Sequence, residues 1–89
     1  MTLSRRETSL LRALTTRGGR RRSDFCRCEG VRAVRELLDK RPDLVEFVAA
    51  TARGFAALGT VPPNARELDE AEFSAISDTV NTQGILALA

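Results

Sequence analysis

The chain has 89 residues, of which 43% are hydrophobic and 29% charged, and its formal net charge is +2. This length suits a single compact domain over residues 1–89 with a thin hydrophobic core. No stretch approaches the roughly 18 apolar residues of a membrane helix, and charged residues interrupt the region where a signal peptide is apolar, so we expect a cytoplasmic protein.

The positive charge is concentrated in the first part of the chain. Residues 1–35 contain ten arginines and three acidic residues, whereas residues 36–89 contain four basic and nine acidic residues. This asymmetry predicts one surface that attracts polyanions and another that repels them. Thirteen of the fourteen basic residues are arginine, whose planar guanidinium group binds phosphate through two donors. A GC-rich genome would also favour arginine, but it would not cluster the charges.

The first predicted element is a helix that begins after Ser4. Ser4 and Glu7 have the spacing of a capping box, in which each side chain bonds a free amide at the helix start. A Gly-Gly pair at 18–19 is expected to end the helix. Its apolar stripe is formed by Leu10, Leu11 and Leu14.

An arginine-rich loop follows this helix and is the main candidate for binding a polyanion. Closely spaced guanidinium groups on an exposed loop can follow a phosphate backbone and release its counterions. Arg5 and Arg12 share a face of the helix and extend the basic surface. With only Phe25 nearby, we expect shape recognition rather than base stacking. A solvated loop and helix solubilisation are the alternatives. The loop candidates are Arg17, Arg20, Arg21 and Arg22.

Residues 23–28 are predicted to form a short strand, and residues 31–41 a helix with one apolar face. Cys26 and Cys28 would then lie on the same face of the strand, where neighbouring positions do not favour a disulfide. The chain has no histidine and no other cysteine, so a tetrahedral zinc site lacks ligands. We interpret both cysteines as buried small apolar residues.

The Glu29-Gly30 pair lies where this strand meets the next helix. In a functional interpretation, Gly30 lets RNA approach the backbone. In the structural interpretation, which we favour, Gly30 relieves crowding in a tight turn and Glu29 accepts amides at the helix start.

Strand and helix patterns continue to alternate in the second half of the chain. The apolar run at 44–48 predicts a strand buried on both faces, residues 51–58 a short helix, and residues 65–68 a minor strand. The alternation predicts a three-layer α/β/α sandwich around a small, mostly parallel four-stranded sheet.

Asp69 and Glu72 repeat the capping-box spacing and begin a helix that should pack Phe73 and Ile76 inward. A polar loop separates this helix from a final strand at 85–88. Within that loop, donors and acceptors suited to a ribose or a base edge come from Asn81 and Gln83. Ordinary turn chemistry is the alternative interpretation of these two residues.

Two segments resemble a known family. Residues 24–34 (DFCRCEGVRAV) resemble the Phe, Glu-Gly and Val signature that opens the SpoU/TrmH family of RNA 2′-O-ribose methyltransferases. Residues 76–79 (ISDT) and 82–87 (TQGILA) resemble the Leu-Ser-x-Thr and Gln-Gly-Ile-x-Ala patterns that end the same domain. Both blocks occur in the family's order and at about its separation. Cys28 stands where a β-branched residue is more usual.

The resemblance implies an N-terminal substrate-binding domain, similar in fold to ribosomal proteins that bind kinked RNA. It also implies a following knotted domain that binds S-adenosylmethionine and forms a homodimer. Nothing in this chain resembles that second domain, and the apolar end at Ala89 is expected to mark a domain boundary or a natural stop after an edge strand. We therefore expect no catalytic residue, metal site or cofactor site in the 89 residues, although the parent protein would be an enzyme.

Three functions remain open from the sequence. The chain is the RNA-recognition domain of a methyltransferase acting on ribosomal or transfer RNA, a stand-alone RNA-binding protein of the same fold, or a protein-interaction and dimerisation module. Salt-sensitive binding to structured RNA would favour the first two.

Overall fold

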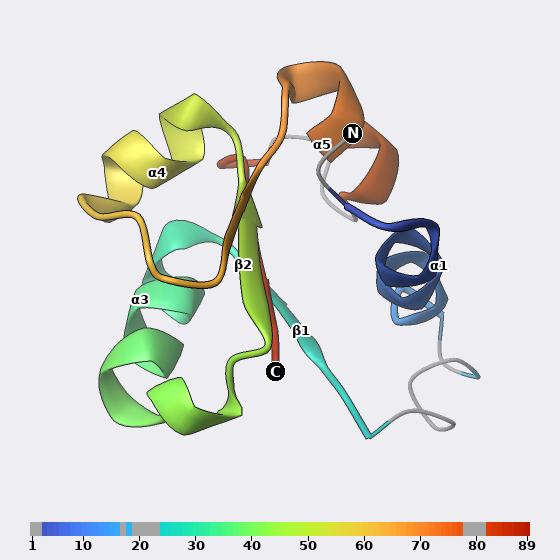
Figure 1. Ribbon diagram of the computed structural model, residues 1–89, viewed down its shortest axis with the longest axis horizontal. Coiled ribbons are helices and arrows are strands. Elements are labelled where there is room, and N and C mark those ends of the chain that lie inside the picture. Colours follow the sequence, from blue (N-terminus) through green and yellow to red (C-terminus); the bar gives the residue numbers. More distant parts are fainter. Residues whose placement is uncertain (1–2, 17, 19–23, 78–81) are drawn as a thin grey trace.

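The computed structural model describes residues 3–16, 18, 24–77 and 82–89 (Figure 1). Helices and strands alternate after the first helix. In chain order the elements are α1 (Arg5–Ala13), β1 (Arg27–Glu29), α3 (Val31–Lys40), the 3-10 helix η1 (Pro42–Leu44), β2 (Phe47–Ala50), α4 (Ala52–Leu58), β3 (Ala65–Glu67), α5 (Glu70–Ile76) and β4 (Ile85–Leu88).

The four strands form one mixed sheet in the order β1-β4-β2-β3. β2 and β3 are parallel, whereas β4 runs antiparallel to both of its neighbours, β1 and β2. A mostly parallel sheet was predicted, and β1, β2 and β3 do run in the same direction. The β2–β3 pairing is parallel, but both pairings of β4 are antiparallel, so the sheet is mixed. β4 starts at the end of the sheet where β1, β2 and β3 finish, so it runs in the opposite direction. It lies between β1 and β2.

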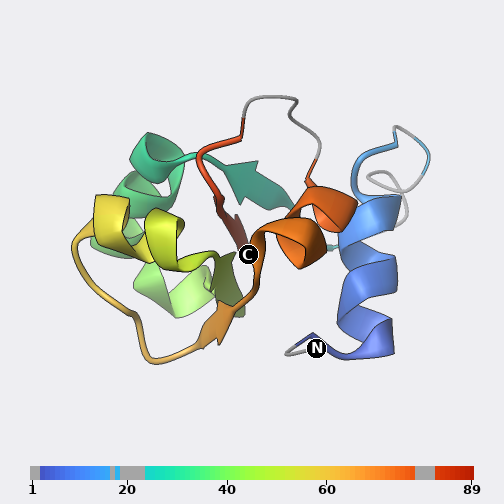
Figure 2. The ribbon, with the colours of Figure 1, turned by 90° about the horizontal axis from the view of Figure 1, so that it is seen from above.

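Helices cover both faces of the sheet, which confirms the predicted three layers (Figures 1 and 2). α3 and α4 pack on one face, and α1 and α5 on the other. The alternation of side chains along a strand divides β4 between the two cores. Leu86 and Leu88 face α1 and α5, whereas Ile85 and Ala87 face α3 and α4. All residues of β2 and β4 are buried, as expected for strands covered on both faces.

Both predicted capping boxes are present. The Ser4 Oγ atom accepts a hydrogen bond from the Glu7 backbone N at 3.0 Å, and Glu7 Oε1 accepts from the Ser4 backbone N at 2.9 Å. At the start of α5, Asp69 Oδ1 accepts from Glu72 N at 2.7 Å, and Glu72 Oε1 accepts from Asp69 N at 3.1 Å. These local patterns set where α1 and α5 begin.

Three predicted boundaries are displaced. α1 ends at Ala13, before the glycine pair, and the strand expected at 23–28 covers only Arg27–Glu29. The strand expected at 44–48 is β2, Phe47–Ala50. Pro42 begins the short helix η1 instead, since its fixed φ angle suits the first position of a helical turn. Leu44 in that turn is 46% exposed.

The interpretation of both cysteines as buried is also wrong. Cys26 is exposed and Cys28 is half-buried, and both are free thiols. β1 is an edge strand, and Cys26 precedes its first residue, so less of the molecule covers it.

Candidate nucleic-acid interface

One edge of the sheet gathers the starts of three helices. β1, β2 and β3 end there and lead into α3, α4 and α5 respectively, and the antiparallel β4 begins there, with Ile85 paired to Ala50. Figure 2 looks onto this edge. We call it the helix-start edge, and it consists of residues 29–31, 50–53, 68–70 and 82–84.

Glu29 is the centre of a largely buried polar cluster behind this edge. Its Oε2 atom accepts hydrogen bonds from Ser77 Oγ at 2.6 Å and from Thr82 Oγ1 at 2.7 Å. Its Oε1 atom lies 2.9 Å from Arg27 Nη2, and the two charged side chains are only 13% and 7% exposed. Arg27 Nη1 also donates to the carbonyl oxygen of Leu11 at 2.9 Å. The Glu29 carboxylate therefore holds the end of α5 and the segment before β4, and its partner Arg27 links them to α1.

The start of α3 is bound by Gln83 rather than by Glu29 in the contacts between described residues. Gln83 Oε1 accepts a hydrogen bond from the Val31 backbone N at 2.8 Å. Gly30, between Glu29 and Val31 in the chain, has a φ angle of 108°, and a Cβ atom on Gly30 would lie 3.2 Å from Gln83 Oε1. The structural interpretation of Gly30 is thus supported, and the acceptor role expected of Glu29 belongs to Gln83.

This bond fixes the orientation of the Gln83 amide. A backbone N–H can only donate, so the side-chain atom facing it must be the oxygen. The Nε2 group, with two donors, is then directed away from Val31, and Gln83 is exposed. No hydrogen bond between described residues uses these donors. They suit acceptors such as phosphate oxygens, ribose hydroxyls and base carbonyls.

Arg53, in the first turn of α4, bonds across the same edge. Its Nη2 and Nε atoms lie 3.0 and 3.3 Å from the carboxylate of Glu70, and its Nη1 donates to the Thr82 carbonyl oxygen at 3.2 Å. The hydrogen bond from Arg53 lowers the pKa of Glu70 below its usual value. Arg53 remains 51% exposed. It therefore ties α4 to α5 and to the segment at 82 while presenting part of its guanidinium group to solvent.

Two glycines allow α4 to approach the start of β4. A Cβ atom on Gly54 would lie 2.1 Å from the Gly84 carbonyl oxygen, which the Thr51 backbone N already bonds at 2.9 Å. Gly84 itself has a φ angle of 77°. Residues 51–58 were predicted to form a helix, and the structure gives Gly54 within that helix a packing role.

The predicted site residues do not form one cluster. Arg5 and Arg12 are exposed on α1, and neither takes part in an ion pair between described residues. Gln83 lies at the helix-start edge, and Figure 2 shows α5 between α1 and the start of β4. The structure therefore separates the α1 arginines from Gln83. The remaining candidates, Arg17, Arg20, Arg21, Arg22 and Asn81, lie outside the described residues.

Other arginines are held by the protein itself. Arg27 is buried in its ion pair, and Arg35 donates to the carbonyl oxygens of Ala57 and Leu58 at the end of α4. Arg32 is exposed in the first turn of α3, next to Val31 and its bond to Gln83. Arg32 is not among the binding residues predicted from the sequence, because nothing local distinguishes it from Arg35.

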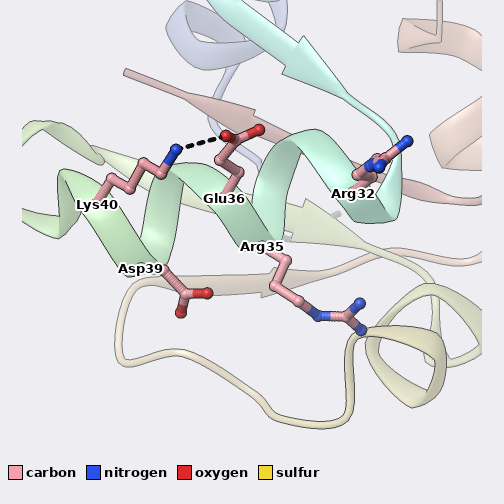
Figure 3. A pocket seen from close by; sticks show the side chains of 5 residues that line it. All are labelled: Arg32, Arg35, Glu36, Asp39 and Lys40. Carbon is pink, nitrogen blue, oxygen red and sulfur yellow. Dashed lines mark hydrogen bonds and ion pairs between the residues drawn. The ribbon is translucent and has the colours of Figure 1, made fainter.

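The outer face of α3 carries a shallow hollow of mixed charge (Figure 3). Lys40 Nζ lies 2.8 Å from Glu36 Oε1, which lowers the pKa of Glu36. In Figure 3, Arg32 lies at the other end of the helix from this pair. The alternating charges do not favour a polyanion here. The hollow is lined by Arg32, Arg35, Glu36, Asp39 and Lys40.

Two other classes of site are absent from the described residues. The described part of the chain contains no group of three or more His, Cys, Asp or Glu side chains that could hold a metal ion. Within the described ranges, no helix has the length and apolar character needed to cross a bilayer.

Comparison with known proteins identifies the family. Residues 8–87 match the family model described as the MRM3-like substrate binding domain. The chain belongs to this family. A solved structure assigned to the TrmH family of RNA methyltransferases, from Porphyromonas gingivalis, is similar to this MRM3-like domain with a TM-score of 0.75 and 28% sequence identity. The predicted relationship to the substrate-binding domain of SpoU/TrmH methyltransferases is thereby confirmed.

This MRM3-like domain spans only part of that relative. The similarity covers 99% of the present chain and 35% of the Porphyromonas protein. No curated protein matches the sequence.

Proposed function

We propose that this MRM3-like domain recognises structured RNA, ribosomal or transfer, for a cytoplasmic 2′-O-ribose methyltransferase. In this proposal a separate domain of the parent enzyme binds S-adenosylmethionine, transfers the methyl group and forms the homodimer. The 89 residues hold the RNA and perform no chemistry. The observation that carries the proposal is the Gln83 side chain, whose oxygen is bound by Val31 N at 2.8 Å and whose two donors therefore point outward.

The charges at the starts of α3 and α4 support binding to a polyanion, whereas α5 at the same edge begins with Glu70 and Glu72. The starts of α3 and α4 carry no acidic residue in their first turns, although the partial positive charge of a helix start normally attracts one. Arginines occupy those turns instead, at Arg32 and Arg53. Helix starts, guanidinium groups and amide donors together suit phosphate and ribose oxygens.

A second, basic surface would bind the RNA backbone. We assign this role to the loop arginines and to Arg5 and Arg12 on α1, with Asn81 acting beside Gln83. Guanidinium groups that contact phosphates release counterions, so they add affinity without sequence specificity. The loop arginines are Arg17, Arg20, Arg21 and Arg22.

The substitution Gln83→Glu tests the helix-start edge. It keeps an oxygen that accepts from Val31 N, and its charge favours a helix start, so the fold should be retained. The outward donors, however, become an acceptor with negative charge. Losing a hydrogen bond to a charged group costs about 1.5–3 kcal/mol. We therefore expect the Kd for a structured RNA to rise at least about tenfold in fluorescence anisotropy.

The matched control is Asn64→Asp, which makes the same amide-to-carboxylate change just before β3, at the opposite edge of the sheet. Asn64 is exposed and donates to the Val45 carbonyl oxygen at a long 3.5 Å. Equal weakening by both variants would mean that only net charge matters, and the edge assignment would fail. Self-association without RNA affinity at low salt would instead indicate a protein-interaction module.

A further inference from the structure

The two free cysteines lie on one face of the edge strand β1. Cys28 pairs with Ala87 of β4, and Cys26 exchanges two backbone hydrogen bonds with Ala89, of 2.7 and 2.9 Å. Partners directly opposite in an antiparallel pair point to the same face of the sheet. Ala87 belongs to the core under α3 and α4, so both thiols lie on that face.

The two thiols lie in different environments. Burial raises the pKa of the Cys28 thiol, and the charge and hydrogen bonding of the neighbouring Cys26 thiol raise it further. Cys26 is exposed, so the pair can be reached from solvent. Two thiols on one face of an edge strand form a ligand set that the RNA-binding proposal does not use.

Strand geometry decides what such a pair can bind. Positions two apart on a strand are separated by about 6.6 Å, whereas a disulfide requires Cβ atoms about 3.8 Å apart. One atom held by two sulfur bonds of about 2.3 Å each spans up to about 4.6 Å between the sulfurs. Rotation of the two side chains can meet this distance without moving the strand. A bridging atom therefore fits better than a direct sulfur–sulfur bond.

We infer that Cys26 and Cys28 form a two-thiolate site for a soft monovalent cation of the Cu(I) class. Thiolates select soft metals, chiefly Cu(I), zinc and iron–sulfur clusters. Zinc and the clusters call for about four ligands. The whole chain has two cysteines, one methionine and no histidine, and the described residues contain no group of three or more His, Cys, Asp or Glu side chains that could hold a metal ion. Two-coordinate Cu(I) needs no further ligand.

Binding in this site is an exchange of protons for metal without any redox step. Two S–H bonds break and two copper–sulfur bonds form, giving a bis-thiolate complex of charge −1 and releasing two protons. The affinity should therefore increase with pH until both thiols are ionised.

Anaerobic titration of the reduced protein with Cu(I), in competition with a chromophoric Cu(I) chelator, tests the site. We expect one Cu(I) per chain, and a loss of at least about 100-fold in affinity for Cys26→Ser and for Cys28→Ser. Circular dichroism of both variants checks that the fold is retained.

Two results would overturn the inference. Wild-type affinity in either serine variant would show that a single thiol binds the metal, and it would exclude a paired site. A complex of one Cu(I) with two chains, detected by native mass spectrometry, would place the metal between molecules. RNA binding by the metal-free protein is independent of both results, so the two proposals fail separately.

Discussion

At the scale of single residues, the Glu29 carboxylate connects several parts of the chain through its hydrogen bonds. Its two oxygens bond Arg27, Ser77 and Thr82, and these partners come from three parts of the chain. A charge pair this deeply buried contributes little net stability when intact, because desolvation offsets the attraction. Removing one member is costly, since the other charge stays buried without a partner. Glu29 thus acts as a positioning residue for the segment that carries Gln83.

Replacing Glu29 by Gln should therefore destabilise the protein strongly. The Arg27 guanidinium group would lose its counter-charge in a site where it is 7% exposed, and breaking such pairs typically costs about 3–5 kcal/mol. Urea denaturation followed by circular dichroism measures this free energy of unfolding. Glu36→Gln is the control, because the Glu36–Lys40 pair is well exposed and its loss should change little. Similar losses for both variants would contradict the role of Glu29.

At the scale of elements, the basic helix α1 is separate from the helix-start edge. α1 packs against α5 on one face of the sheet, whereas Arg32 and Arg53 begin helices on the other face. An RNA that contacts both surfaces must pass the end of α5, where Ser77 is bonded to Glu29. Such an extended contact suits recognition of a folded RNA shape more than of a short sequence.

Replacing Arg20, Arg21 and Arg22 together by Ala should weaken RNA binding and its dependence on salt. Each phosphate contact contributes roughly −0.7 to −0.9 to the slope of log K against log salt, so losing two or three contacts should flatten the slope by about 2. Anisotropy titrations at several salt concentrations give this slope. Arg41→Ala is a control for net charge, since Arg41 is paired with Asp43 beside η1. An unchanged slope in the triple variant would show that the loop does not contact RNA.

At the scale of the whole molecule, one strand joins the two cores. β4 contributes Leu86 and Leu88 to the core under α1 and α5, and Ile85 and Ala87 to the core under α3 and α4. The same strand bonds both β1 and β2. A substitution that destabilises either core should therefore destabilise the whole domain.

Leu86→Ala and Ile85→Ala test this coupling from opposite faces. Both side chains are fully buried, and each truncation should cost about 2–5 kcal/mol. We expect a single unfolding transition in both variants, and native-state hydrogen exchange should show amides of α3 and of α5 losing protection together. Loss of protection in one layer alone would show that the two cores unfold separately.

The sequence predicted those features that depend on neighbouring residues. The capping boxes at Ser4 and Asp69 were predictable because each is formed by two residues only three positions apart in the sequence. The bond between Gln83 and Val31 joins residues 52 apart, and no local pattern indicates it. The place of β4 in the sheet was likewise not predictable, because alternating helices and strands are compatible with several strand orders. The sequence therefore predicted Gln83 as a candidate binding residue but not its bond to the start of α3.

The central position of β4 also bears on how the protein is made. β1 has β4 as its sheet neighbour, more than fifty residues further along the chain, so it must wait for the last strand before it gains a partner. During synthesis on the ribosome, the earlier elements would emerge before the complete four-stranded sheet can form. Such non-local pairing slows folding, and it makes release of the final strand the event that allows the domain to become native.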